Sequence, residues 1–295
     1  MVEGVVLKLR ILTMSGSILR LNNSMITTIL PILRCPLCGG GFEKKDASLV
    51  CAKRHTFDIA RQGSVNFVPQ QKESFYKKEL FESRAKVFEA GVYAPVIAAL
   101  SEAIERYVKK EHPVLLDAGC GEGYYTKAVC PERNMTRIGF DLSKEAVKLA
   151  AKGPKTAFFC AADLKNIPLA DHSCDVLLDI FTPANYAEFA RVLAPQGLVM
   201  KLAPRAGYLK ELRQAASALL RRSEYDGGQV EQYVKEKMNL LEQTAITYTM
   251  PVDQETVFHL ARMTPMLAGI DVEALDLSGI TEITIDETLY IGSIK

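Results

Sequence analysis

Short apolar runs alternate with helical patterns from residue 113 onward, and this alternation constrains the fold more than any other feature of the chain. It is typical of the α/β class, in which helices cover both faces of a parallel sheet. The predicted strands are residues 114–116, 137–140, 157–160, 175–181 and 198–202. Two later β-rich stretches, 245–250 and 280–291, flank a predicted helix at 253–262 and could pair as antiparallel edge strands.

Length and composition suit one large domain and one small one. The chain has 295 residues, of which 48% are hydrophobic, as expected of a globular protein. The net charge of +1 means that any surface for nucleic acid must come from local clustering of charge. Seven cysteines without a regular framework argue against a disulfide-linked secreted protein and favour a reducing cytoplasm.

The first 34 residues differ from the rest of the chain. Arg10, Arg20 and Asn22 interrupt the apolar stretches, so no run approaches the roughly 18 residues that span a bilayer. We therefore expect residues 1–34 to be a dispensable extension, with Met25 as the preferred start and no membrane contact. A targeting segment is the open alternative.

A metal-binding pattern follows in residues 35–70. Cys35 and Cys38 are separated by two residues, and Cys51 and His55 by three, with twelve residues between the pairs. Thiolate and imidazole ligands in a set of four are typical of structural zinc, whereas a catalytic zinc needs an open position. The spacing predicts a small structural module whose folding energy comes mostly from Zn²⁺.

The surroundings of this module are basic. Residues 34–78 hold nine Lys or Arg against four Asp or Glu, which predicts contact with nucleic acid phosphates. Five aromatic residues are interleaved and could stack on bases, namely Phe42, Phe57, Phe67, Phe75 and Tyr76. The alternative is a solvated basic face with the aromatics in a small core. Residues 70–78 are interpreted as a linker, and residues 71–112 as the region of linker helices.

A glycine-rich loop joins the first strand of the alternation to its helix. Its pattern is D-x-G-x-G-x-G, with Asp117 at the strand end and Gly119, Gly121 and Gly123 in the turn. Glycines let the backbone pass close to a bound nucleoside. A dinucleotide fingerprint would place its third glycine where this chain has Tyr124, which disfavours a bound pyrophosphate.

Two further carboxylates follow the next strands. Asp141 ends the second strand, 18 residues after Gly123, and could accept both ribose hydroxyls of an adenosine. Asp163 follows the third strand and could meet the adenine amino group. Helix capping or turn chemistry is the alternative for such acids. With the loop, this set resembles the class I methyltransferases, whose cofactor is S-adenosylmethionine and whose acid at the Asp117 position lies near the methionine.

A closer resemblance covers residues 35 to about 215. The order of metal module, helices and α/β core is similar to the RlmA/TlrB family of 23S rRNA (guanine-N1)-methyltransferases. The residues that carry the resemblance are Cys35–Cys38, Cys51–Asp58, Gly63–Val68, Ala90–Gly91 with Tyr93 and Pro95, Asp117–Thr126, Asp141–Lys144 and Ala190–Leu193. The resemblance implies a zinc-ribbon-like domain and a Rossmann-like, mostly parallel, seven-stranded methyltransferase domain over residues 113–295.

The resemblance also implies an activity and further site residues. The family methylates N1 of a guanine in a hairpin loop of 23S ribosomal RNA, holds zinc at the four ligands named above, and suggests a homodimer. Its cofactor contacts carry over to Tyr93, Tyr125 and Thr126. Tyr208 stands where the family has a histidine, and its hydroxyl could still bond a carboxylate.

Guanine N1 carries a proton that must leave as the methyl arrives, and it lies on the pairing edge, so the target must be unpaired or extruded. Asp179 and Phe181 end the fourth strand, which faces the substrate crevice of an open sheet. Phe181 could stack on the guanine and Asp179 could accept the proton. The alternatives are a core Phe181, an Asp179 that only bonds its neighbours, and water as the acceptor.

Other functions stay open at this point. The chain could be an RNA-binding protein with a vestigial methyltransferase fold, or a methyltransferase for another RNA or a small molecule. The intact set of Asp117, Gly119, Gly121 and Asp141 favours an active enzyme, and the basic metal module favours RNA.

Overall fold

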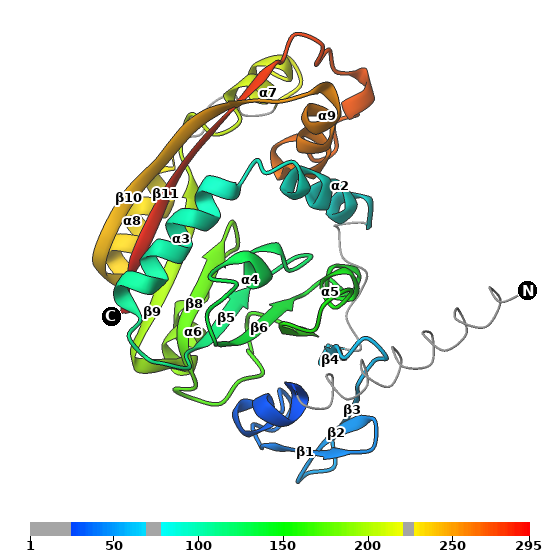
Figure 1. The fold of residues 1–295 in the computed structure, drawn as a ribbon, viewed down its shortest axis with the longest axis vertical. Coiled ribbons are helices and arrows are strands. Elements are labelled where there is room, and N and C mark those ends of the chain that lie inside the picture. Colours follow the sequence, from blue (N-terminus) through cyan, green and yellow to red (C-terminus); the bar gives the residue numbers. More distant parts are fainter. Residues whose placement is uncertain (1–24, 69–77, 221–226) are drawn as a thin grey trace, which may run out of the picture.

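The computed structural model describes residues 25–68, 78–220 and 227–295, and an eight-stranded sheet organises them (Figure 1). The strands lie side by side in the order β10-β11-β9-β8-β5-β6-β7-β4. Their bounds are β4 Val65–Asn66, β5 Val114–Ala118, β6 Thr136–Asp141, β7 Phe158–Ala161, β8 Cys174–Ile180, β9 Leu193–Pro204, β10 Met238–Pro251 and β11 Glu282–Ile294. Strands β4 to β9 pair in parallel, whereas β11 is antiparallel to both of its neighbours.

The predicted alternation is confirmed, with one correction in the tail. The five predicted strands of the α/β core are β5 to β9, and the two tail strands pair antiparallel as expected. Of these two tail strands only β10 is an edge strand, because β11 inserts between β9 and β10. The burial patterns agree, since β11 is almost continuously buried while exposed and covered residues are mixed along β10.

Helices cover both faces of the sheet (Figure 1). One face carries the first core, which includes Val176, Leu178 and Ile180, and the other carries the second core, which includes Leu177. Residues of the first core come from α2 Lys78–Glu89, α3 Ala94–Tyr107, α4 Tyr124–Ala128, α7 Lys210–Ala215 and α9 Gln254–Met263. The second core takes residues from α6 Tyr186–Val192 and α8 Gly228–Lys237, while α5 Lys144–Ala150 contacts β6 and β7.

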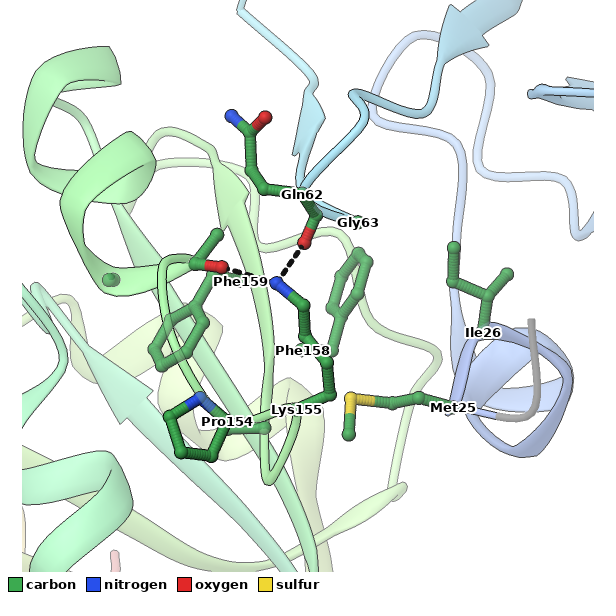
Figure 2. Close-up of a pocket in the computed structure, with 11 residues that line it drawn as sticks. Met25, Ile26, Gln62, Gly63, Pro154, Lys155, Phe158 and Phe159 are labelled. Carbon is green, nitrogen blue, oxygen red and sulfur yellow. Dashed lines mark hydrogen bonds between the residues drawn. The ribbon is translucent and has the colours of Figure 1, made fainter. Parts of the chain in front are cut away.

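The cysteine-rich module is joined to this sheet. Its own three strands are antiparallel, namely β1 Phe42–Lys45, β2 Ser48–Cys51 and β3 Thr56–Asp58. Strand β4 then leaves the module and pairs with β7, so the sheet has one strand more than the seven expected. At this joint Lys155 Nζ donates to the carbonyl of Gln62 at 2.7 Å, beside a cavity of about 10 Å³ (Figure 2). Such a volume admits at most one water, so the joint is well packed.

Residues 25–34 belong to the folded body, unlike the extension predicted for residues 1–34. Ile26, Ile29 and Leu33 are at most 2% exposed and lie in the second core. Leu33 also forms a β-bridge with Leu169. The predicted dispensability remains a prediction for residues 1–24, which lie outside the described residues, as does nearly all of the predicted linker at 70–78.

No single helix among the described residues has the length and apolar character to cross a membrane. The consecutive helices α2 and α3 meet those two criteria only jointly, and they meet at an angle of 79°.

Candidate active site and metal centre

The four predicted metal ligands lie together. Their ligand atoms are all within 4.8 Å of one another. Cys38 Sγ is 3.6 Å from Cys51 Sγ, and His55 Nδ1 is 3.5 Å from Cys35 Sγ and 3.4 Å from Cys51 Sγ. A tetrahedral zinc with Zn–S bonds of about 2.3 Å places its sulfurs about 3.8 Å apart, so the set fits Zn²⁺ with no open position.

Local turns bring these ligands together. Gly39 has a φ of 74° and donates its N–H to the carbonyl of Cys35 at 2.8 Å, which folds the first pair into one turn. Arg54 has a φ of 64° and donates to Cys51 at 2.7 Å in the second turn. Each turn therefore aligns the two ligands of one pair, and the antiparallel pairing of β1 with β2 brings the two pairs to one ion.

The aromatic residues of this module form a small core. Phe42, Phe57 and Phe67 are at most 7% exposed and their ring centroids lie 5.0–5.8 Å apart. The prediction that these three stack on bases is therefore wrong, because the rings are occupied with one another. Phe75 and Tyr76 lie outside the described residues.

The glycine-rich loop forms a cradle at the carboxyl end of β5. Gly119, Gly121 and Gly123 have φ values of 73°, 57° and 79°, a region that side chains rarely adopt. A Cβ on Gly119 would overlap the side chain of Thr182, and one on Gly123 would lie 2.7 Å from the ring of Phe159. The loop thus brings bare backbone to the strand ends, as a closely approached nucleoside requires.

Asp117 and Thr126 are bonded to each other beneath this loop. The hydroxyl of Thr126 donates to Asp117 Oδ2 at 2.6 Å, and both side chains are buried. Burial raises the pKa of the Asp117 carboxyl to about 7. Thr126, predicted to contact the cofactor, holds the carboxyl of Asp117 in this structure.

Asp141 and Asp163 end β6 and follow β7, as predicted. Asp141 Oδ2 accepts the N–H of Gly121 at 2.9 Å and its Oδ1 accepts that of Ser143 at 2.7 Å. The carboxylate is thereby held beside the glycine loop, where a ribose would lie. Asp163 Oδ1 accepts the N–H of Lys165 at 2.9 Å, which is turn chemistry, and its contact with adenine stays a prediction.

Two residues that the sequence analysis did not single out lie at the loop, Glu122 within it and Arg84 against it. Arg84 of α2 bonds Glu122 at 2.9 Å, and its guanidinium is also 3.7 Å from the position of a Cβ on Gly121. Oε1 of Glu122 is buried with no hydrogen-bond partner among the described residues. A charged Glu122 inside a glycine loop was a possible signal, but nothing local marked Arg84, which is 38 residues away.

Three predicted tyrosines gather on the same side of the sheet. The hydroxyls of Tyr93 and Tyr208 are 2.6 Å apart, although 115 residues separate them. Tyr125 is 3% exposed, and its hydroxyl has no partner among the described residues. The centroid of Phe181 lies 5.4 Å from that of Tyr208. Tyr208 therefore joins the other predicted cofactor contacts despite replacing a histidine.

The two predicted catalytic residues have different surroundings. Phe181 adopts a φ of 55°, a costly conformation for a bulky residue and one that is frequent at functional sites. Asp179 is fully buried and its Oδ2 accepts a hydrogen bond from Lys201 Nζ at 2.8 Å. Lys201 also donates to the carbonyl of Thr182 at 3.2 Å, so this ion pair supports the turn that contacts Gly119.

Comparison with known proteins gives matches over both parts of the chain. Residues 33–75 match the family model described as the RlmA N-terminal zinc ribbon, and residues 116–200 match a methyltransferase domain. YxjB of Bacillus subtilis, named among the 23S rRNA (guanine-N1)-methyltransferases, is 34% identical over 90% of this chain and 98% of its own length. The 23S rRNA (guanine(748)-N1)-methyltransferase of Streptomyces fradiae is 29% identical over the same shares.

Proposed function

This chain belongs to the RlmA family of 23S rRNA (guanine-N1)-methyltransferases, and from that premise we propose that it methylates N1 of a guanine in a hairpin loop of 23S ribosomal RNA. The observation that carries the proposal is that the glycine-rich loop and the zinc module belong to one folded body. A cradle suited to a nucleoside lies at the ends of β5 and β6, and β4 links the zinc module to the same sheet.

The cofactor site would use residues already in place. The ribose would bond Asp141, the methionine end would lie near Asp117, and Tyr93, Tyr125 and Tyr208 would line the far side. S-adenosylmethionine supplies a methyl group already activated by a sulfonium, so the protein mainly aligns and shields the reactants. The residues fit this role because the three loop glycines carry no side chains of their own at the strand ends.

The substrate would enter at the end of β8. We expect Phe181 to stack on the target guanine, since its unusual φ places the ring beside Tyr208 rather than deep in the core. The zinc module would bind the surrounding RNA with its basic side chains, several of which are exposed, including Lys45, Lys53 and Arg54. This arrangement favours a flexible loop over a duplex, because N1 must be freed from pairing.

The test is methyl transfer by the purified full chain to a 23S rRNA transcript, followed by mapping of modified guanines at nucleotide resolution. The guanine equivalent to position 748, named for the Streptomyces relative, is the first to examine. Methylation of N1 at one guanine supports the proposal. Methylation of metabolites but not of RNA would favour the small-molecule alternative, and absence of S-adenosylmethionine binding in calorimetry would favour a vestigial fold.

We further propose a cytoplasmic enzyme that forms a homodimer. All seven cysteines are free, which suits a reducing compartment. The homodimer rests on the family resemblance alone. Light scattering during size-exclusion chromatography measures the mass of the protein in solution and so tests the dimer. Cell fractionation tests the location.

A further inference from the structure

Glu287 on β11 is a buried acid that the cofactor and zinc sites do not use. Its side chain is 0% exposed, and neither carboxyl oxygen has a hydrogen-bond partner among the described residues. Burial, followed by the negative charge of Asp286, raises the pKa of Glu287 well above its ordinary value. An unpartnered buried carboxyl is costly, so its presence calls for a functional explanation.

Glu287 lies at the edge of the sheet where substrates bind. It pairs with Pro204, the last residue of β9, whereas the end of β8 lies at Ile180, opposite Leu202. Glu287 is therefore level with the turn that follows β8 and carries Phe181. In an open parallel sheet, the crevice beyond these strand ends is the binding site.

The side chain also faces the correct side of the sheet. Residues two apart on a strand point to the same face, and Glu287 lies between Ile285 and Leu289, both of the first core. Asp117 shares that face with Leu115 of β5. Asp179 lies two residues from Leu177 of the second core and so points to the opposite face.

The groups near Glu287 are phenols, and no cation offsets its charge in the described residues. Its charge raises the pKa of four tyrosines that come from four separate segments of the chain, Tyr93, Tyr125, Tyr208 and Tyr248. Arg84 lowers the pKa of three of these phenols, but only burial and Asp286 act on Glu287 itself. None of these phenol hydroxyls bonds Glu287 in the described part of the chain, so its two oxygens are free to accept donors from a bound molecule.

Tyr93, Tyr125 and Tyr208, which would line the cofactor site, also lie near Glu287, so strand spacing is needed to separate the cofactor from the substrate. Strand β11 is three strands from β5, which carries Asp117, a separation of about 14 Å across the sheet. The methionine end of the cofactor is expected near Asp117, and the RNA base is expected beyond it, toward Phe181. Seen from Asp117, Glu287 lies on the side of Phe181, where the RNA base is expected.

We propose that Glu287 accepts the N1–H and N2–H groups of the target guanine and takes the N1 proton during methyl transfer. This inference rests on the proposed function. Guanine is the only standard base with two adjacent N–H donors on its pairing edge, and the two oxygens of one carboxylate can accept both. Glu287 is thus both the selector of guanine and the base.

The proton and electron balance is complete. The N1–H bond breaks, its proton passes to an oxygen of Glu287, and the electron pair on N1 forms the new bond to the methyl carbon. The electron pair of the S–C bond stays on sulfur. The two N–H donors of the guanine would stabilise the ionised carboxylate that this step requires, and the proton later leaves to solvent.

The test compares Glu287→Gln with Glu282→Gln, an exposed position at the start of the same strand. We expect Glu287→Gln to lower the single-turnover rate on the rRNA transcript by about 100-fold or more. Affinity for S-adenosylmethionine should stay within a factor of two, and Tm should not fall, because the unpartnered acid is removed. Glu287→Asp should recover part of the rate, and Glu282→Gln should match the wild type.

A transcript with inosine at the mapped guanine provides a second readout, since inosine lacks the N2 amino group. The wild type should lose rate on this transcript, while Glu287→Gln should show little additional loss. Three outcomes would overturn the inference. They are an unchanged rate in Glu287→Gln, a tenfold loss of cofactor affinity in that variant, or a lower Tm in that variant with no recovery of rate in Glu287→Asp. A wild type that leaves the transcript unmethylated would instead overturn the proposed function, and this inference with it.

Discussion

Thr126 donates its hydroxyl hydrogen to Oδ2 of Asp117 across 2.6 Å, linking the end of β5 to the first turn of α4. The bond lies directly beneath the glycine cradle, so the position of the cradle depends on a buried acid. Because burial raises the pKa of Asp117 to about 7, this acid changes its charge near neutral pH. The stability of the site should therefore depend on pH.

The variant Asp117→Asn tests this dependence. The folded protein keeps a proton on Asp117 up to a pKa of about 7, whereas the unfolded chain loses it near 3.8. The stability of the wild type should therefore fall more steeply than that of the variant as pH rises through this interval, because the variant lacks this one titrating group. We expect the difference in Tm, variant minus wild type, to increase by at least about 3 °C from pH 5 to pH 8, which corresponds to roughly 1 kcal/mol. The exposed Asp46→Asn is the control, and a pH-independent difference would contradict the prediction.

Zinc removal should unfold the amino-terminal module. The apolar side chains that it buries are few, chiefly Leu49, Val65 and the three phenylalanines, too small a set to replace the metal energetically. We expect Cys51→Ser to lose its bound zinc and the activity on rRNA, as measured by metal analysis and methyl transfer. Cys130→Ala, outside the module, should keep one zinc per chain. Full zinc content in Cys51→Ser would show that the ligand set is wrong.

Loss of the Asp141 carboxylate should weaken cofactor binding. Its oxygens already accept backbone N–H groups of Gly121 and Ser143, which orient it toward the cradle. We expect Asp141→Asn to raise the Kd for S-adenosylmethionine at least tenfold in calorimetry, since bonds to a charged group contribute about 1.5–3 kcal/mol. Asp163→Asn should have a smaller effect. A Kd for S-adenosylmethionine that is the same in Asp141→Asn as in the wild type would contradict the placement of the ribose.

The amino-terminal boundary can be tested by truncation and substitution. Removal of residues 1–24 should leave Tm and activity unchanged, as predicted for a dispensable extension. Ile29→Ala should instead cost about 2–5 kcal/mol, because it removes a side chain that is 1% exposed in the second core. The Tm of the truncated protein and of Ile29→Ala, measured by thermal unfolding, tests both expectations. A large loss of stability on truncation would show that the extension is needed.

Prediction from sequence succeeded where the signal was local. The spacing of Cys35, Cys38, Cys51 and His55 indicated the metal centre, and the glycine loop indicated the cradle. It failed for the aromatic residues of the module, because hydrophobic periodicity does not tell a stacking surface from a three-ring core. One signal was present but unused: Glu287 interrupts an otherwise apolar face of β11, and a charged residue in such a position is rare.

Sequence by itself therefore determined the strands of the α/β core and their order, the metal ligands and the glycine-rich loop, since these depend on interactions between residues close along the chain. Tertiary structure alone decided that β4 joins the large sheet, that Arg84 meets Glu122 and that Tyr93 meets Tyr208. It also decided the desolvation of Glu287. The physical reason is that burial and pKa arise from the packing of distant segments, a property that no local pattern encodes.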